Sequence, residues 1–164
     1  MKSIQFHFSY EEFSSIEELP LHDQQLLTAA REVTSHSYAP YSHFSVGAAA
    51  LLKNGVQVLG TNQENASYPV GICAERTLMA SAATQYPGIA IEAMAISYHN
   101  FNLPDSNEHA ISPCGMCRQA LNEFEQRTQT PIRLILSGMT GEVIVIKTAA
   151  HLLPLAFTGK ELLR

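Results

Sequence analysis

Three cysteines and one glutamate form two short clusters that could hold a reactive metal ion. Cys73 is followed two positions later by Glu75, and the pair Cys114 and Cys117 follows Pro113. Three thiols supply soft metal ligands, and the nearby carboxylate stays free to move a proton. Cys-x-Glu with a distant Pro-Cys-x-x-Cys is typical of a zinc site that attacks the amine-bearing carbon of a nucleobase.

The placement of the three thiols favours their ionised form. Cys114 and Cys117 are three positions apart at the start of a predicted helix, so their side chains project to the same side. Cys73 also begins a predicted helix, and the partial positive charge of a helix N-terminus lowers the pKa of a thiol. No histidine stands beside the clusters at ligand spacing. One Zn²⁺ per subunit would therefore keep a position for water, which indicates a catalytic site.

Two charged residues close to Cys73, namely Glu75 and Arg76, have predicted roles at the same site. Glu75 would shuttle protons, because this chemistry needs a carboxylate that does not bind the metal. Three thiolates leave a zinc centre with net negative charge, and hydrogen bonds from Arg76 to the sulfur atoms would offset it. The alternatives are a carboxylate that only complements the helix dipole and a surface arginine.

Other interpretations of the cysteines remain open. The segment from Cys114 to Cys117 could be a thioredoxin-like redox pair, or all three cysteines could be buried structural residues. A non-enzymatic, zinc-stabilised interaction module would need a fourth protein ligand. None of these interpretations gives a reason for Glu75 two positions after Cys73.

The chain as a whole is typical of one globular domain. Its 164 residues are 46% hydrophobic and 15% charged, and we expect one domain over 1–164 with an N-terminal extension over 1–20. No apolar run could span a bilayer, and the N-terminus lacks the apolar stretch of a signal peptide, which favours a cytoplasmic location. The net charge of −5 and the scattered basic residues disfavour binding to nucleic acid.

Hydrophobic periodicity predicts the first elements. Residues 3–10 alternate apolar and polar side chains, which favours a short edge strand, and residues 11–19 are typical of a solvated connection. A helix is expected over 20–36, with Pro20 in its first turn. Its inward face would consist of Leu26, Leu27, Ala30 and Val33.

The rest of the chain predicts an α/β fold. Asn54-Gly55 favours a type I′ turn between strands over 44–52 and 56–60. The later elements, in chain order, are expected to be a loop over 62–71, a helix over 73–86, a strand over 90–98, a polar loop over 99–112, a helix capped by Ser112 with Pro113 in its first turn, strands over 132–136 and 143–146, and a short helix over 148–153. This order predicts a three-layer α/β/α arrangement around a mixed five-stranded sheet.

Several segments of the chain resemble those of the cytidine deaminases. They are residues 38–49, 62–68, 73–77, 112–119 and 152–157, within a similarity that covers roughly Leu26 to Leu163. The zinc motifs resemble the cytidine and deoxycytidylate deaminase superfamily in general. The Asn-x-Glu-Asn-Ala block resembles the small, homotetrameric class with three cysteine ligands, whose members act on free nucleosides.

The resemblance implies roles for individual residues. Asn62 and Glu64 would hydrogen-bond the ribose 3′-hydroxyl, and Phe44 would pack on the base. The backbone N–H of Ala74 would contact the base carbonyl, and the carbonyl of Ser112 would lie near the departing amine.

The resemblance also implies an assembly. Tyr68 and Phe157 would enter a neighbouring subunit's pocket, so that a homotetramer shares its active sites. Three features depart from the family pattern: a longer segment before Leu26, a longer loop 99–112, and Leu155 where the family often has glycine.

The expected activity is hydrolytic deamination of cytidine and 2′-deoxycytidine to uridine and 2′-deoxyuridine, with release of ammonia, in pyrimidine salvage. Such an enzyme is a zinc-dependent hydrolase of C–N bonds in cyclic amidines. The alternatives are a deaminase of another small aminated base, of the blasticidin type, and the zinc-stabilised module. A nucleotide deaminase would need a basic cluster for the phosphate, and a polynucleotide editor would need a basic stripe, neither of which we find.

Overall fold

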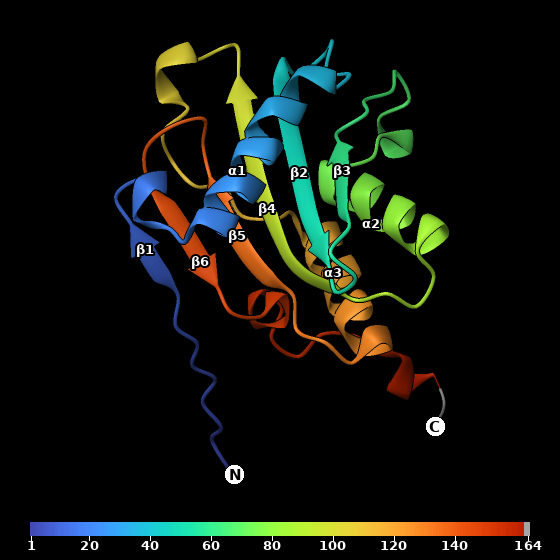
Figure 1. Ribbon diagram of the computed structural model, residues 1–164. Coiled ribbons are helices and arrows are strands. Elements are labelled where there is room, and N and C mark those ends of the chain that lie inside the picture. The colour runs from blue at the N-terminus through green and yellow to red at the C-terminus, as the bar shows by residue number, and fades with distance from the viewer. Residues whose placement is uncertain (163–164) are drawn as a thin grey trace.

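A six-stranded mixed sheet forms the middle layer of the fold (Figure 1). The computed structural model describes residues 1–162, so Leu163 and Arg164 of the expected domain lie outside the described residues. Strand order is β1-β6-β5-β4-β2-β3, and every neighbouring pair is antiparallel except the parallel pair β4 and β5. The strands are β1 Glu11–Phe13, β2 Phe44–Leu52, β3 Gln57–Thr61, β4 Ile91–Asn100, β5 Arg133–Ser137 and β6 Val143–Ile146.

Three α-helices cover the two faces of the sheet, which confirms the expected three-layer fold. Helix α1 (Leu21–Val33) covers one face, and helices α2 (Ala74–Gln85) and α3 (Gly115–Thr128) cover the other (Figure 1). The four residues predicted for the inward face of α1 are all buried. Short 3₁₀ helices are Ile16–Glu18, Thr34–His36, Tyr68–Val70, Pro104–Ser106, Ala149–Leu152 and Gly159–Glu161. Within residues 1–162, no helix is long and apolar enough to cross a membrane.

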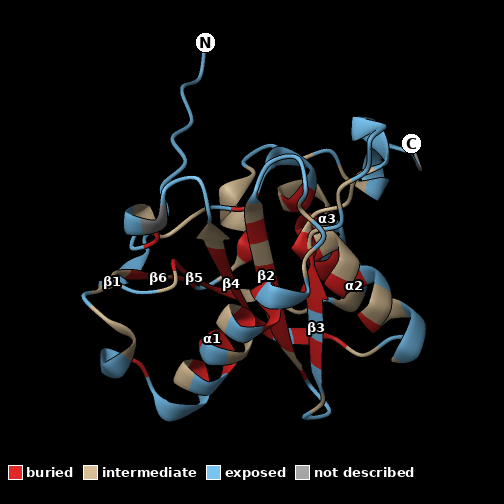
Figure 2. Ribbon diagram, turned by 90° about the horizontal axis from the view of Figure 1, so that it is seen from above, coloured by how far each residue is buried: buried red, intermediate tan, exposed pale blue. Residues whose placement is uncertain are grey.

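The side chains of the central strand β4 show how the sheet separates two cores. Its small residues Ala93 and Ala95 pack on the α1 side, whereas Met94 and Ile96 pack between the sheet and helices α2 and α3. This alternation follows from the two-residue period of a strand. Buried residues therefore line the middle strands, whereas the N-terminal segment is exposed (Figure 2).

The prediction of the N-terminal strand is wrong in its position. Residues 3–10 lie outside the sheet, and the predicted connection contains β1, which raises the number of strands from the expected five to six. The three residues of β1 pair with 143–145, the first three residues of β6. Beyond Ile146 the chain leaves the sheet for a 3₁₀ helix, so residues 3–10 have no neighbouring strand within the described chain.

Two turn and cap predictions are also wrong. In the β2–β3 hairpin only Gly55 has positive φ (82°), and its N–H donates to the Leu52 carbonyl, so the turn is not type I′. Helix α3 begins at Gly115 with Cys114 as its N-cap, rather than at Ser112 and Pro113. Cys114 remains extended, with ψ of 168°, and this places its thiol at the very start of the helix.

Candidate metal centre and active site

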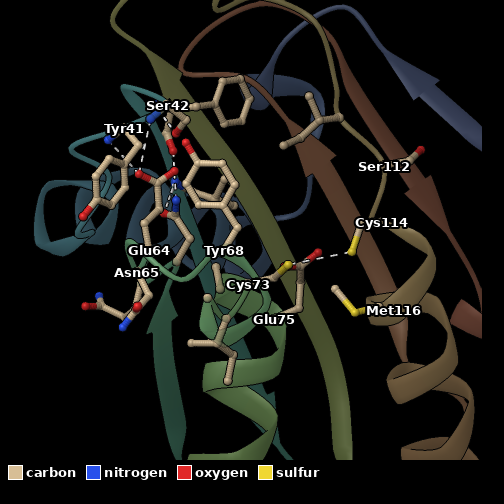
Figure 3. Close-up of a pocket in the computed structure, with 18 residues that line it drawn as sticks. Tyr41, Ser42, Glu64, Asn65, Tyr68, Cys73, Glu75, Ser112, Cys114 and Met116 are labelled. Atoms are coloured by element: carbon tan, nitrogen blue, oxygen red, sulfur yellow. Dashed lines mark hydrogen bonds between the residues drawn. The ribbon is translucent and has the colours of Figure 1, made fainter.

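The three cysteines lie together because helices α2 and α3 begin side by side (Figure 3). Cys73 is the N-cap of α2, Cys114 is the N-cap of α3, and Cys117 is in the first turn of α3. The Sγ atoms of Cys73 and Cys114 are 3.7 Å apart, and those of Cys114 and Cys117 are 3.5 Å apart. The predicted cluster is therefore formed by residues that are about 40 positions apart in the chain.

The geometry of the three sulfurs fits a tetrahedral zinc ion. Zn–S bonds of about 2.3 Å give an S···S separation of about 3.8 Å in a tetrahedron, close to the two separations in this cluster. All three ligand atoms lie within 4.8 Å of one another. In the part of the chain that the structure describes, no fourth histidine, cysteine or carboxylate belongs to the group. A zinc ion here would keep one position open.

The cysteine thiols interact electrostatically even without a metal. The Cys117 thiol donates a hydrogen bond that lowers the pKa of Cys73 to about 6, and the same contact raises the pKa of Cys117. One thiolate is thus stabilised between neighbouring thiols at two helix N-termini. Without a metal, the contacts therefore favour the zinc-binding thiolate at Cys73 and disfavour it at Cys117.

Glu75 lies in the first turn of α2, and its carboxylate is directed toward the cysteine cluster (Figure 3). Its side chain lines the same cavity as Cys73 and Cys114, although only 5% of the residue is exposed. Burial raises the pKa of Glu75, because desolvation penalises the charged carboxylate. A buried, non-ligating carboxylate beside an open metal position is suited to proton transfer.

Arg76 acts on the cluster through its charge, because after the hydrogen bond from Cys117 it is one of the influences that lower the pKa of Cys73. It lines a second hollow of about 300 Å³ together with Phe124 and Arg127, and no hydrogen bond between the described residues joins it to a cysteine sulfur. Arg118, which the sequence analysis missed, instead holds the segment before Cys114. Its Nε donates to the Pro113 carbonyl at 2.8 Å, and its Nη1 donates to the Leu152 carbonyl at 3.2 Å. The sequence could have indicated this role, because Arg118 directly follows the Cys-x-x-Cys pair.

A cavity of about 780 Å³ extends from the cysteine cluster to the loops after α1 and β3 (Figure 3). This volume is in the range of small-molecule sites. The lining includes most of the residues assigned by resemblance, namely Phe44, Asn62, Glu64, Tyr68, Ala74 and Ser112. It also includes residues that the sequence analysis did not single out, namely Tyr41, Ser42, Val46, Gln63, Asn65, Gly71, Ile72, Ile111 and Met116.

Glu64 is fixed at the end of the cavity away from the cysteines (Figure 3). Its Oε2 accepts hydrogen bonds from the backbone N–H of Tyr41 at 2.9 Å and of Ser42 at 3.3 Å. Partial burial acts to raise the pKa of Glu64, but the hydrogen bonds from Ser42 and Tyr41 outweigh it and hold the pKa below its ordinary value. The carboxylate therefore stays charged and is held by the segment at Tyr41 and Ser42.

Asn62 connects the same end of the cavity to strand β2. Its Oδ1 accepts from the Val46 N–H at 2.8 Å, and its Nδ2 donates to the Phe44 carbonyl at 2.9 Å. The ring of Phe44 stacks on Tyr98 of β4, with centroids 4.9 Å apart and an angle of 10° between the planes. Phe44 is thereby held in place by Tyr98 where it lines the cavity.

Phe157 is the one residue assigned to substrate binding that lies outside the cavity lining. It is 58% exposed, and its carbonyl accepts a hydrogen bond from the Gln119 side chain. Tyr68 lines the cavity rim and is 76% exposed, with its ring against Tyr41. Leu155 is fully exposed and has a positive φ of 57°, a backbone conformation that favours glycine.

Comparisons with known proteins point to one family. The sequence model described as "Cytidine and deoxycytidylate deaminase zinc-binding region" matches residues 20–130. Cytidine deaminase of Halalkalibacterium halodurans is 32% identical over 139 residues, which are 85% of this chain and 96% of the relative. The crystal structure of cytidine deaminase from Burkholderia pseudomallei is 37% identical, with a TM-score of 0.70 over 85% of this chain and 100% of that chain. Blasticidin-S deaminase of Bacillus cereus is 28% identical over 83% of this chain and 92% of the relative.

Proposed function

The chain belongs to the cytidine and deoxycytidylate deaminase family, and from this premise we propose that it hydrolyses cytidine and 2′-deoxycytidine to uridine and 2′-deoxyuridine. One water molecule is consumed and one ammonia is released for each turnover. The observation that carries the proposal is the cluster of Cys73, Cys114 and Cys117 with Glu75 buried beside it at the end of the cavity. The reaction would serve pyrimidine salvage in the cytoplasm.

The three cysteines and Glu75 would have separate roles in the reaction. When bound by the cysteines, zinc supplies Lewis acidity that lowers the pKa of a water molecule to about 7. Glu75 would take one proton from the attacking water and deliver it to ring N3, which makes C4 more electrophilic, while the hydroxyl group adds to C4. Glu75 would then carry the proton of the new C4 hydroxyl to the amino group, so that the C4–N bond breaks, the C4 carbonyl forms and neutral ammonia leaves.

The remaining residues would orient the nucleoside along the cavity. The base would lie on Phe44, with the Ala74 N–H at its carbonyl and the Ser112 carbonyl near its amine. The ribose 3′-hydroxyl would lie between Asn62 and the carboxylate of Glu64. The support for this placement is that these groups line one cavity, and that Glu64 and Asn62 are already held by backbone groups.

A homotetramer with shared active sites would complete the cavity. Tyr68 and Phe157 would each enter the pocket of a neighbouring subunit. The support is their exposure, because two large aromatic side chains that are 76% and 58% exposed favour burial against a partner. Arg76 would turn toward the sulfur atoms in the metal-bound enzyme to offset their negative charge.

The cavity lining favours a free nucleoside over a nucleotide. Within the described chain, no lysine or arginine lines the cavity, so a phosphate group would have no cationic partner. Asn62 and Glu64 are suited to a ribose hydroxyl, which disfavours a blasticidin-type substrate. A non-enzymatic module would require a fourth ligand at the cluster.

A substrate panel on the zinc-loaded protein tests the proposal. Cytidine and 2′-deoxycytidine should lose their absorbance with time, whereas dCMP, guanine and blasticidin S should be turned over far more slowly. Chelation should abolish the reaction, and added zinc should restore it. Faster turnover of blasticidin S would favour the alternative deaminase, and an absence of turnover with full zinc content would favour the structural module.

A further inference from the structure

Residues 2–10, which we call the N-terminal arm, extend from the free edge of the sheet (Figure 1). The family match begins only at residue 20, so the arm is outside the shared domain. Among the described residues, no backbone N–H or C=O of residues 2–9 is hydrogen-bonded to another backbone group. The arm therefore presents an unpaired backbone next to β1.

The arm carries a row of exposed apolar side chains. Ile4, Phe6, Phe8 and Tyr10 are 82%, 54%, 44% and 54% exposed. Phe6 and Phe8 both pack near His151, with ring centroids 6.0 and 5.9 Å away, so these two rings lie beside the 3₁₀ helix Ala149–Leu152. Four alternating apolar residues are the pattern of a strand with one buried face.

The adjoining strand has an edge that can accept such a strand. Strand β1 pairs with β6 on one side and has no partner on the other within residues 1–162. An edge strand with unpaired backbone groups is a template for pairing with another chain. The open edge of β1 and the apolar row of the arm are next to each other in the chain. A partner that pairs with the backbone there would also cover the apolar side chains.

We propose that this arm pairs antiparallel with the arm of a second copy of the chain, across a twofold axis at His7. Directly opposite residues of an antiparallel pair share a face, so the two apolar rows meet only where even-numbered residues oppose even-numbered residues. With His7 opposite His7, Ile4 lies opposite Tyr10 and Phe6 lies opposite Phe8 in both directions. Every apolar side chain of the arm then has an apolar partner.

The charged residues at the two ends of the paired segments favour the same register, with His7 on the axis. With His7 on the axis, Lys2 of one copy lies opposite Glu12 of the other, which gives two ion pairs at the ends of the ribbon. Moving the axis to Phe6 places Lys2 opposite Tyr10, and moving it to Phe8 places Ile4 opposite Glu12. Because one sequence is complementary to itself in both polarity and charge, the occupant is a second copy.

Cysteine cross-linking of the zinc-loaded full chain tests the register. His7→Cys should form a disulfide-linked dimer when oxidised glutathione is added, because opposite residues on paired strands are within disulfide distance. Gln5→Cys and Ser9→Cys are matched controls. Each alone would place its substituted residues about 14 Å apart, whereas a mixture of the two variants should form a mixed dimer, since residue 5 lies opposite residue 9.

The outcomes of cross-linking are distinct. No dimer from His7→Cys above the level of the unsubstituted chain would overturn the proposal. Equal dimer formation by all three single variants would also overturn it, because it would indicate unspecific contact or a partner of another kind. Cross-linking does not depend on catalysis, so a negative result would not argue against the proposed function.

Charge exchange supplies a second test of the same register. Lys2→Glu should lower the yield of His7→Cys dimer at low salt about two- to fivefold, the range of an exposed ion pair. Adding Glu12→Lys to that variant should restore the yield, because the exchanged charges again oppose each other. Restoration by an unrelated change, such as Glu32→Lys on α1, would contradict the pairing of Lys2 with Glu12.

Discussion

At one end of the cavity, the cysteine sulfurs belong to residues that start helices α2 and α3, whereas at the other end Glu64 is held by the backbone of the irregular segment at Tyr41 and Ser42. The metal end is formed by two helix starts that lie side by side, and helix geometry sets the directions of Cys114 and Cys117 within one turn. The far end is fixed by hydrogen bonds between loops. We therefore expect changes at the metal end to abolish chemistry, and changes at the far end to weaken substrate binding by degrees.

The strongest test of this comparison is Cys117→Ser. The Cys117 thiol is buried against the other two, so its loss should deplete zinc and reduce deamination at least as far as loss of the proton shuttle. Zinc content by mass spectrometry and deamination rate measure both effects. Met116→Leu, on the same helix turn, is the control that should keep zinc. Full zinc content in Cys117→Ser would show that the cluster is not the metal site.

Glu75→Gln separates chemistry from metal binding at the same end. This variant should retain zinc, because Glu75 is not a ligand, yet kcat should fall about 10²–10⁴-fold through loss of proton transfer. Steady-state kinetics and zinc content on one preparation provide the comparison. Near-normal turnover by Glu75→Gln would remove its assignment as the proton shuttle.

At the far end, Glu64→Gln should reduce kcat/KM for cytidine about tenfold to a hundredfold, the range for losing a hydrogen bond to a charged group. The loss should be mainly in KM, and zinc content should be unchanged. A substrate without the ribose 3′-hydroxyl, 2′,3′-dideoxycytidine, is the control, because the substitution should scarcely affect it. An equal loss for both substrates would show that Glu64 does not contact that hydroxyl.

Asn102→Ala should give the smallest effect. Asn102 Nδ2 donates to the Ser42 carbonyl at 2.7 Å, so this residue of loop 99–112 supports the segment that holds Glu64. Loss of one neutral hydrogen bond should raise KM for cytidine about two- to tenfold with kcat unchanged. Asn54→Ala, in the β2–β3 turn outside the cavity, should leave KM unaltered. A fall in kcat alone would contradict this role.

The elements of the fold that follow local rules were predictable. The inward face of α1, both helices that carry the cysteines and the three-layer arrangement follow from periodicity and helix signals in the sequence. Residues 3–10 illustrate the limit, because their alternation is that of a strand and yet β1 lies at Glu11–Phe13. The position of β6 decides which N-terminal residues can join the sheet. That pairing is between segments about 130 positions apart in the chain, so local sequence patterns do not show it.

The sequence by itself was sufficient to predict the chemistry proposed for this protein: three thiols and one carboxylate at two helix starts. Short-range spacing accounts for Cys114 and Cys117, because a helix fixes the relative directions of residues within one turn. Cys73 lies beside them only because α2 and α3 begin side by side. Only the tertiary structure decided how the far end of the cavity is held, with Glu64 on the Tyr41 and Ser42 backbone and Phe44 on Tyr98. Those contacts join segments far apart in the chain, and their formation depends on the packing of the whole sheet.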